Sequence, residues 1–159
     1  MNEMNGYDVE DLHSGMRATF SKTITEADIV LFAAVSGDNN ALHINEEFAA
    51  TTRFGGRIAH GFLTASAISA AVANRLPGPG TIYLSQQLNF RAPVRIGQTV
   101  HATVSVSAVD RERRRVTLQT VCRVGQTVVI DGQAIVMTTS SAKRSAAVEI
   151  AEVRVPSLV

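Results

Sequence analysis

The strongest constraint on the fold lies in the second half of the chain, where apolar and polar residues alternate strictly. Between residues 98 and 109, Val or Ala occupies the even positions from 100 to 108, and Thr, His or Ser occupies the odd positions between them. A period of two places all apolar side chains on one face of a β-strand. Similar patterns cover residues 82–90, 116–124 and 127–138. Short polar or Gly-containing segments join these stretches, so we expect four consecutive antiparallel strands in a meander. The apolar face of the strand over residues 82–90 is expected to carry Ile82, Leu84, Leu88 and Phe90.

The first half of the chain carries helix signals instead. Thr25, with acidic residues one and three positions later, is typical of a helix N-cap, and Gly37 is typical of the residue after a helix. Asn45 is predicted to cap a second, short helix that runs through residue 51. The longest helix is expected over Gly61–Leu76, which is rich in Ala and almost free of charge, so we expect protein around it on most sides. A short strand is expected near residues 16–22.

This order of elements predicts an α+β protein. One strand precedes the helices, a long buried helix follows, and four antiparallel strands complete the chain. An antiparallel sheet wrapped around a long central helix is the layout of the hot-dog fold. We therefore predict a single hot-dog domain over residues 15–140, with an N-terminal extension over residues 1–14 and a C-terminal tail over residues 141–159.

Composition excludes several classes of function. The chain has 159 residues and a net charge of +1, which gives no overall field to hold nucleic acid or a membrane surface. No stretch approaches the roughly 20 apolar residues of a spanning helix, and the N-terminus lacks the pattern of a secretory signal. The single Cys122 excludes an internal disulfide and fits a reducing compartment. We expect a cytoplasmic protein that binds neither nucleic acid nor membrane.

The most informative polar segment carries Asp38 and His43. Gly37 and the two Asn residues at 39 and 40 tolerate positive φ, so the chain can turn sharply and aim both side chains at one small volume. A carboxylate and an imidazole around one water molecule can remove one proton and supply another, as water addition requires. The alternative is structural: Asp38 forms the turn and His43 packs in the loop.

Gly61 stands at the predicted start of the long helix, directly after His60. Backbone N–H groups at a helix N-terminus are unpaired and carry partial positive charge. A glycine there lets a substrate carbonyl approach closely and receive a hydrogen bond. The alternative is that Gly61 only permits close contact between helix and sheet. For His60 there are likewise two explanations, that it orients the Gly61 turn or that it only forms a local hydrogen bond.

Together these segments resemble one known family. The first reads Phe32-x-x-Val35-Ser36-Gly37-Asp38-x-Asn40-x-Leu42-His43, with Ala49 after five further residues. The second is His60-Gly61, and further matches lie at Pro77-Gly78-Pro79-Gly80, residues 82–86 and residues 89–94. On these motifs, which span about residues 15–139, the chain resembles the MaoC-like (R)-specific enoyl-CoA hydratases. One position departs, because Ala41 stands where the family usually has Pro.

The resemblance implies both an activity and a set of site residues. Members of the family are single hot dogs that pair into homodimers and reversibly hydrate trans-2-enoyl-CoA, an acyl-CoA thioester, to (3R)-3-hydroxyacyl-CoA. Asp38 and His43 fall on the catalytic dyad, and Gly61 falls on the backbone donor to the thioester oxygen. No cofactor and no metal are expected, since no His or Cys grouping has metal-ligand spacing and neither a GxGxxG motif nor a P-loop is present.

Three further residues have expected substrate-binding roles by position. Ser69 matches a polar position near the dyad, and Val72 and Ile135 are expected at the floor of the acyl pocket. A place in the core is the alternative for each of them. The basic residues of the turn at 110–115 have two explanations, a solvated hairpin tip or a grip on CoA phosphates.

Two other functions compete with hydration. One is acyl-CoA thioester hydrolysis on the same fold, and the other is a non-catalytic module that binds acyl-CoA or a partner. Release of a free thiol separates hydrolysis from hydration, and binding without turnover identifies the module.

Overall fold

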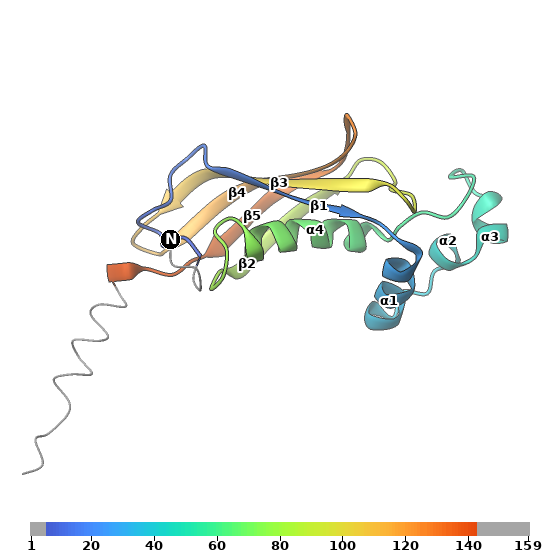
Figure 1. Cartoon of the computed structure of the whole chain (residues 1–159), viewed down its shortest axis with the longest axis horizontal. Coiled ribbons are helices and arrows are strands. Elements are labelled where there is room, and N and C mark those ends of the chain that lie inside the picture. The colour runs from blue at the N-terminus through green and yellow to red at the C-terminus, as the bar shows by residue number, and fades with distance from the viewer. Residues whose placement is uncertain (1–5, 143–159) are drawn as a thin grey trace, which may run out of the picture.

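Five antiparallel strands form one sheet, in the order β1–β3–β4–β5–β2 (Figure 1). The structure, a computed structural model, describes residues 6–142. The strands are β1 (Arg17–Thr23), β2 (Ile82–Phe90), β3 (Thr99–Asp110), β4 (Arg115–Val124) and β5 (Thr127–Met137). All five fall where strands were predicted, within a few residues at each end.

One face of this sheet forms the core together with α4 (Gly61–Asn74). The predicted alternation holds on β3, where the even-numbered residues from Val100 to Val106 are buried. The helix lies along this face of the sheet (Figure 1) and buries Leu63, Ala67 and Ala71. Small side chains let the helix and the strands approach closely, and the predicted α+β arrangement of sheet and long helix is confirmed.

The opposite side of α4 is open in the single chain. Phe62 is 67% exposed, and Ser66, Ser69 and Ala73 are exposed along the same helix. Protein around the helix on most sides was predicted, and this is wrong for the single chain. The reason is that all five strands lie in one sheet, which covers α4 from one side only.

The predicted four-strand meander requires β2 to lie beside β3. Instead, β2 pairs with β5 at the opposite edge of the sheet. β1 pairs with β3 and occupies the edge that β2 would need. The connection over residues 91–98 can span about 26 Å when extended, whereas crossing three strand spacings needs only about 14 Å. Within residues 6–142, β3, β4 and β5 therefore form the meander, and β2 is an edge strand that pairs with β5 alone.

The register of β2 against β5 shifts between Tyr83 and Ser85. An extra residue in one strand reverses which side chains face the core beyond that point. Tyr83, Gln86 and Leu88 line a hollow together with α4 residues. The predicted single face of Ile82, Leu84, Leu88 and Phe90 is therefore wrong, because the bulge separates Ile82 from the last two.

Three helices lie at the end of the sheet at which α4 begins (Figure 1), namely α1 (Glu26–Ser36), α2 (Ala41–Ile44) and α3 (Glu46–Ala50). Thr25 caps α1 in a capping box with Asp28, and Gly37 ends the helix with a φ of 76°, as predicted. Asn45 caps α3, as predicted, by accepting the Phe48 N–H at 2.9 Å. The four-residue α2 was not predicted.

The described part of the N-terminal segment packs into the domain. Val9 and Leu12 are 1% and 0% exposed, and the Tyr7 N–H donates to the Pro77 carbonyl at 2.7 Å. Core packing therefore includes residues before position 15, where the domain was predicted to begin. The predicted tail lies outside the described residues from position 143 onward. Among residues 6–142, no helix is both long enough and apolar enough to cross a bilayer.

Candidate active site

Short-range hydrogen bonds shape the loop that carries Asp38. Gly37 reverses the chain after α1, and the Ser36 hydroxyl accepts the Asp38 N–H at 3.2 Å. The Asp38 carboxylate in turn accepts the Asn40 N–H at 3.3 Å. Such local bonds from Ser, Asp and Asn replace the bonds of regular structure, so the loop is held by its own side chains.

Ala41, where the family usually has Pro, is the first residue of α2. Proline is favoured at that position because its missing N–H has no helical partner there. In this chain the Asn40 side chain caps the start of α2 by accepting the Leu42 N–H at 3.0 Å. The departure from the family pattern therefore leaves a capped helix start.

The loop and the start of α4 bring three titratable side chains together. Asp38, His43 and His60 each offer an atom within 4.8 Å of the other two. Asp38 is exposed in the single chain, whereas His43 and His60 are 9% and 1% exposed. The structure thus places Asp38 beside His43, as the turn residues predicted.

The same cluster has the residue types of a metal site, which sequence spacing did not reveal because His60 lies far along the chain. One ring nitrogen of each histidine is already bonded to a backbone carbonyl, of Ile58 for His43 and of Asp38 for His60. Each imidazole therefore has at most one nitrogen left for a ligand. The chemistry of the donor set allows a cation, but the hydrogen bonds equally describe a proton-transfer site.

A hydrogen bond fixes the tautomer of His43. Its Nδ1 lies 2.9 Å from the Ile58 carbonyl oxygen, which can only accept, so Nδ1 carries the proton. The neutral ring then has its lone pair on Nε2, and His43 lines a cavity at the start of α4. This tautomer suits a general base.

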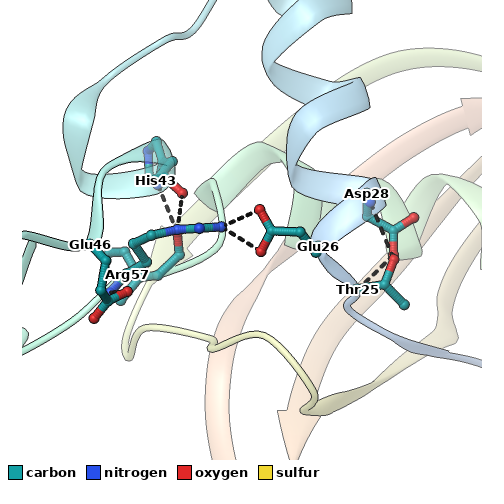
Figure 2. A network of polar contacts seen from close by, with 7 residues as sticks. Thr25, Glu26, Asp28, His43, Glu46 and Arg57 are labelled. Carbon is teal, nitrogen blue, oxygen red and sulfur yellow. Dashed lines mark hydrogen bonds and ion pairs between the residues drawn. The ribbon is translucent and has the colours of Figure 1, made fainter.

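Arg57 is hydrogen-bonded to the backbone of His43 (Figure 2). Its Nε donates to the His43 carbonyl at 2.8 Å, and its Nη2 contacts both carboxylate oxygens of Glu26 on α1 at 2.6 and 2.7 Å. The Arg57 N–H also donates to Glu46 at 3.3 Å. One side chain therefore ties the loop before α4 to α1 and α2.

A cavity of about 230 Å³ opens beside His43 and the first residue of α4. Its lining is mainly apolar and consists of His43, Arg53, Phe54, Ile58, Ala59, Gly61, Thr64, Phe90, Arg91, Ala92, Pro93, Val94 and Ile130. As the first helical residue, Gly61 has an N–H without an intrahelical acceptor. His43 and the residue that carries this unpaired N–H thus line the same cavity.

The two explanations for Gly61 both have support. A Cβ at this position would lie 2.8 Å from a ring carbon of Phe90, closer than side chains pack. Glycine therefore permits the contact between α4 and β2, as the structural alternative requires. The same close contact leaves the Gly61 backbone on the cavity wall.

Two cationic side chains on the cavity wall have partners. Arg91 pairs with Asp131 at 2.7 Å, and this hydrogen bond lowers the pKa of the Asp131 carboxyl. Arg53 lies 4.8 Å over the ring of Phe54. By contrast, the basic turn after β3 lies at the other end of the sheet, where Arg111 donates to the Leu12 carbonyl at 3.2 Å. That turn is a hairpin tip away from the cavity of this chain.

The structure does not bring Ser69 to the dyad within one chain. Ser69 lies eight positions after Gly61, about 12 Å along the helix axis. Ser69 instead lines a second hollow of about 210 Å³ between α4 and β2, together with Phe62 and Tyr83. Burial in this region raises the pKa of Tyr83 to about 12.

Val72 and Ile135 lie on opposite sides of the sheet. Val72 is 1% exposed and packs in the core. On β5 the neighbours Ala134 and Val136 are fully buried on the α4 side, so alternation directs Ile135 to the outer face. The predicted floor made of Val72 and Ile135 does not form, because the β5 residues buried in the core beside Ile135 are Ala134 and Val136.

Sequence reasoning missed the parts played by Arg57 and Ile58 and left His60 without a firm role. The contacts of all three join segments that lie 14 to 31 residues apart in the chain. The only signal was their position in the run Arg57-Ile58-Ala59-His60 directly before the helix start.

The comparisons with known proteins agree with this architecture. Residues 11–130 match the family described as MaoC like domain, and the chain belongs to that family. It is 54% identical over 128 residues to the (R)-specific enoyl-CoA hydratase of Rhodospirillum rubrum, covering 80% of this chain and 89% of that protein. It is 53% identical over 127 residues to the 3-hydroxybutyryl-CoA dehydratase of Methylorubrum extorquens, covering 80% and 81%.

A solved structure is similar over most of the chain. The unliganded R-hydratase PhaJ1 from Pseudomonas aeruginosa superposes with a TM-score of 0.81 at 40% identity, covering 87% of this chain and 89% of that one. The hot-dog fold predicted from the sequence is confirmed by this likeness.

Proposed function

We propose that the protein is an (R)-specific enoyl-CoA hydratase, which adds water reversibly to trans-2-enoyl-CoA and forms (3R)-3-hydroxyacyl-CoA. The observation that carries this proposal is that His43 and Gly61, the first residue of α4, line one cavity, with Asp38 beside His43. Relatives that are more than half identical bear the names of an enoyl-CoA hydratase and a hydroxyacyl-CoA dehydratase, which are two directions of one reaction.

The geometry supports a division of roles. The free Nε2 of His43 takes a proton from water, whose oxygen adds to the β-carbon of the enoyl group. The Gly61 N–H binds the thioester oxygen and stabilises the enolate that develops there, a contribution of about 3–4 kcal/mol to the barrier in comparable sites. Asp38, in its protonated form, delivers the proton to the α-carbon. The proton on His43 then returns to Asp38, so the net change is addition of one water molecule.

Hydration transfers no electrons, so the predicted absence of a redox cofactor follows from the reaction itself. The predicted absence of a metal stays a prediction, since the side chains near His43 allow a cation. Activity of the protein after dialysis against a chelator checks it.

The test is a spectrophotometric assay over trans-2-enoyl-CoA thioesters from four carbons upward. We expect loss of the enoyl absorbance without release of free thiol. Thiol release would support the thioesterase alternative instead, and binding of acyl-CoA without any turnover would support a non-catalytic module. The acyl length with the highest kcat/KM defines the chain-length preference.

We also propose a homodimer, as the resemblance predicted. In the described part of the chain β2 lies at an edge of the sheet, and exposed edges readily pair with another chain. Ile82, Leu84 and Phe90 on this strand are about half exposed, and Phe62 on the open side of α4 is 67% exposed. Light scattering on a sizing column measures the mass, and a monomer would contradict the proposal. The cytoplasmic location predicted from the sequence stays a prediction.

A further inference from the structure

His60 contacts both members of the proposed dyad, Asp38 and His43, but is not itself part of the dyad. It precedes α4 at the N-cap position, yet its side chain makes no capping bond to the helix. It is 1% exposed and lies among the largest fully buried side chains in residues 6–142. The ring is therefore committed to other contacts.

The first contact is with the backbone of Asp38. The Nε2 of His60 lies 3.0 Å from the Asp38 carbonyl oxygen, 22 residues away in the chain. A carbonyl only accepts, so Nε2 carries the proton and donates. This bond joins the loop after α1 to the start of α4. It is a long-range restraint on Asp38, whose other backbone and side-chain bonds come from within the same loop.

The second contact is with the ring of His43. The ring centroids of His43 and His60 lie 3.9 Å apart, with planes tilted by 33°. Phe32 of α1 contacts His60 as well, at 4.9 Å between centroids. His60 therefore limits how far the His43 ring can tilt, while the Ile58 carbonyl limits its rotation.

The second ring nitrogen of His60, Nδ1, indicates that filling space is not the reason for a histidine at this position. Within the described part of the chain, its Nδ1 is buried and has no hydrogen-bond partner. A buried acceptor without a partner destabilises a protein, and an apolar ring would fill the same space without that cost. The histidine is therefore explained by the bond that its other nitrogen makes.

We propose that His60 is a positioning residue for hydration, which fixes the Asp38 backbone through Nε2–H and the His43 ring through stacking. This inference rests on the proposed function, because it assigns to His60 the mutual placement of the two groups that handle protons. Displacing a reacting group by about 1 Å can cost about 100-fold in rate.

Two variants separate the two contacts. His60→Phe keeps an aromatic ring for stacking and lacks the donor, whereas His60→Gln keeps an N–H donor and lacks the ring. We expect kcat to fall by about 10- to 100-fold in each, with KM within about twofold of wild type, because substrate binding is not the step affected. His60→Ala, which lacks both, is expected to have the lowest kcat. A matched control is His101→Gln on the outer face, where the His101 ring is hydrogen-bonded to Ser21 at 2.7 Å.

Rates are compared per mole of folded protein, with folding followed by circular dichroism. A wild-type kcat in folded His60→Phe would overturn the role of the bond to Asp38, and a wild-type kcat in both variants would overturn the whole proposal. A loss of total activity that equals the loss of folded protein would also overturn it, since a merely structural role leaves the rate per folded molecule unchanged. If wild type itself fails to hydrate enoyl-CoA, the proposed function fails instead, so the two failures are distinguishable.

Discussion

The two ends of α4 are built for different purposes. At its C-terminal end, Leu76 is 2% exposed and backbone bonds from residues 6 and 7 to the Pro79 and Pro77 carbonyls close the core. At its N-terminal end, Gly61 opens on a cavity beside His43. One end satisfies its polar groups within the chain, and the other leaves a donor and a base for a ligand. Substitutions at the two ends should therefore change different quantities.

The largest expected effect is at the N-terminal end. His43→Ala and Asp38→Asn should each lower kcat by about 10²- to 10⁴-fold, because each removes a group that transfers a proton. The fold should persist, since the loop lies outside the sheet. Hydration rates and circular dichroism of the purified variants measure both quantities. Near-normal turnover in either variant would remove that residue from the dyad.

Leu12→Ala tests the closed end. Leu12 is fully buried in the main core, so the substitution should lower the free energy of unfolding by about 2–5 kcal/mol. Denaturant unfolding measures this loss, and kcat of the folded protein should stay unchanged. A parallel fall in kcat would show that the two ends of α4 are coupled and do not control stability and catalysis separately.

Gly61→Ala separates the two explanations for that glycine. The added Cβ would meet the Phe90 ring at 2.8 Å, and crowding of this kind costs about 1–3 kcal/mol. Alanine keeps the N–H, so the double variant Gly61→Ala/Phe90→Ala should recover stability and much of the activity. Recovery of stability without activity would mean that the substrate itself needs the space beside Gly61.

The smallest effect is expected at Asp28, which lies with Glu26 in the first turn of α1 but makes no contact with Arg57 or the cavity. Burial opposes its ionisation, yet hydrogen bonds from Thr25 and Lys22 outweigh burial and lower the pKa of the Asp28 carboxyl. Asp28→Asn should cost about 0.3–1 kcal/mol at neutral pH, as expected for an acidic group at a helix N-terminus.

The pH dependence of that cost follows from the sign of the shift. A carboxyl with a lowered pKa stabilises the fold above its unfolded pKa of about 4, and this stability is lost as pH falls through the folded pKa. The difference between wild type and Asp28→Asn should therefore shrink on acidification below about pH 4. Unfolding curves at several pH values measure it, and a difference that persists at low pH would assign the effect to packing.

Local patterns predicted much of this molecule. Period-two alternation found β3, β4 and β5, and capping residues found both ends of α1 because these signals act within a few residues. The Asp38 and His43 pair was also predictable, since the turn that joins them is local.

Long-range pairing was not predictable in the same way. The position of β2 in the sheet depends on the pairing of β1 with the free edge of β3. Which β2 side chains point into the core depends on a bulge between Tyr83 and Ser85. Ile135 was assigned to the core side by position, and one residue of register decides between it and Val136. The bond from His60 to Asp38 exists only because α4 begins beside the end of α1.

The configuration of the hydration product tests the central proposal most directly. Crotonyl-CoA, the four-carbon trans-2-enoyl thioester, is incubated with the protein, and the 3-hydroxyacyl product is resolved by chiral chromatography. We expect the (3R) product with no free thiol. A (3S) product would contradict the assignment of this cavity to (R)-specific hydration.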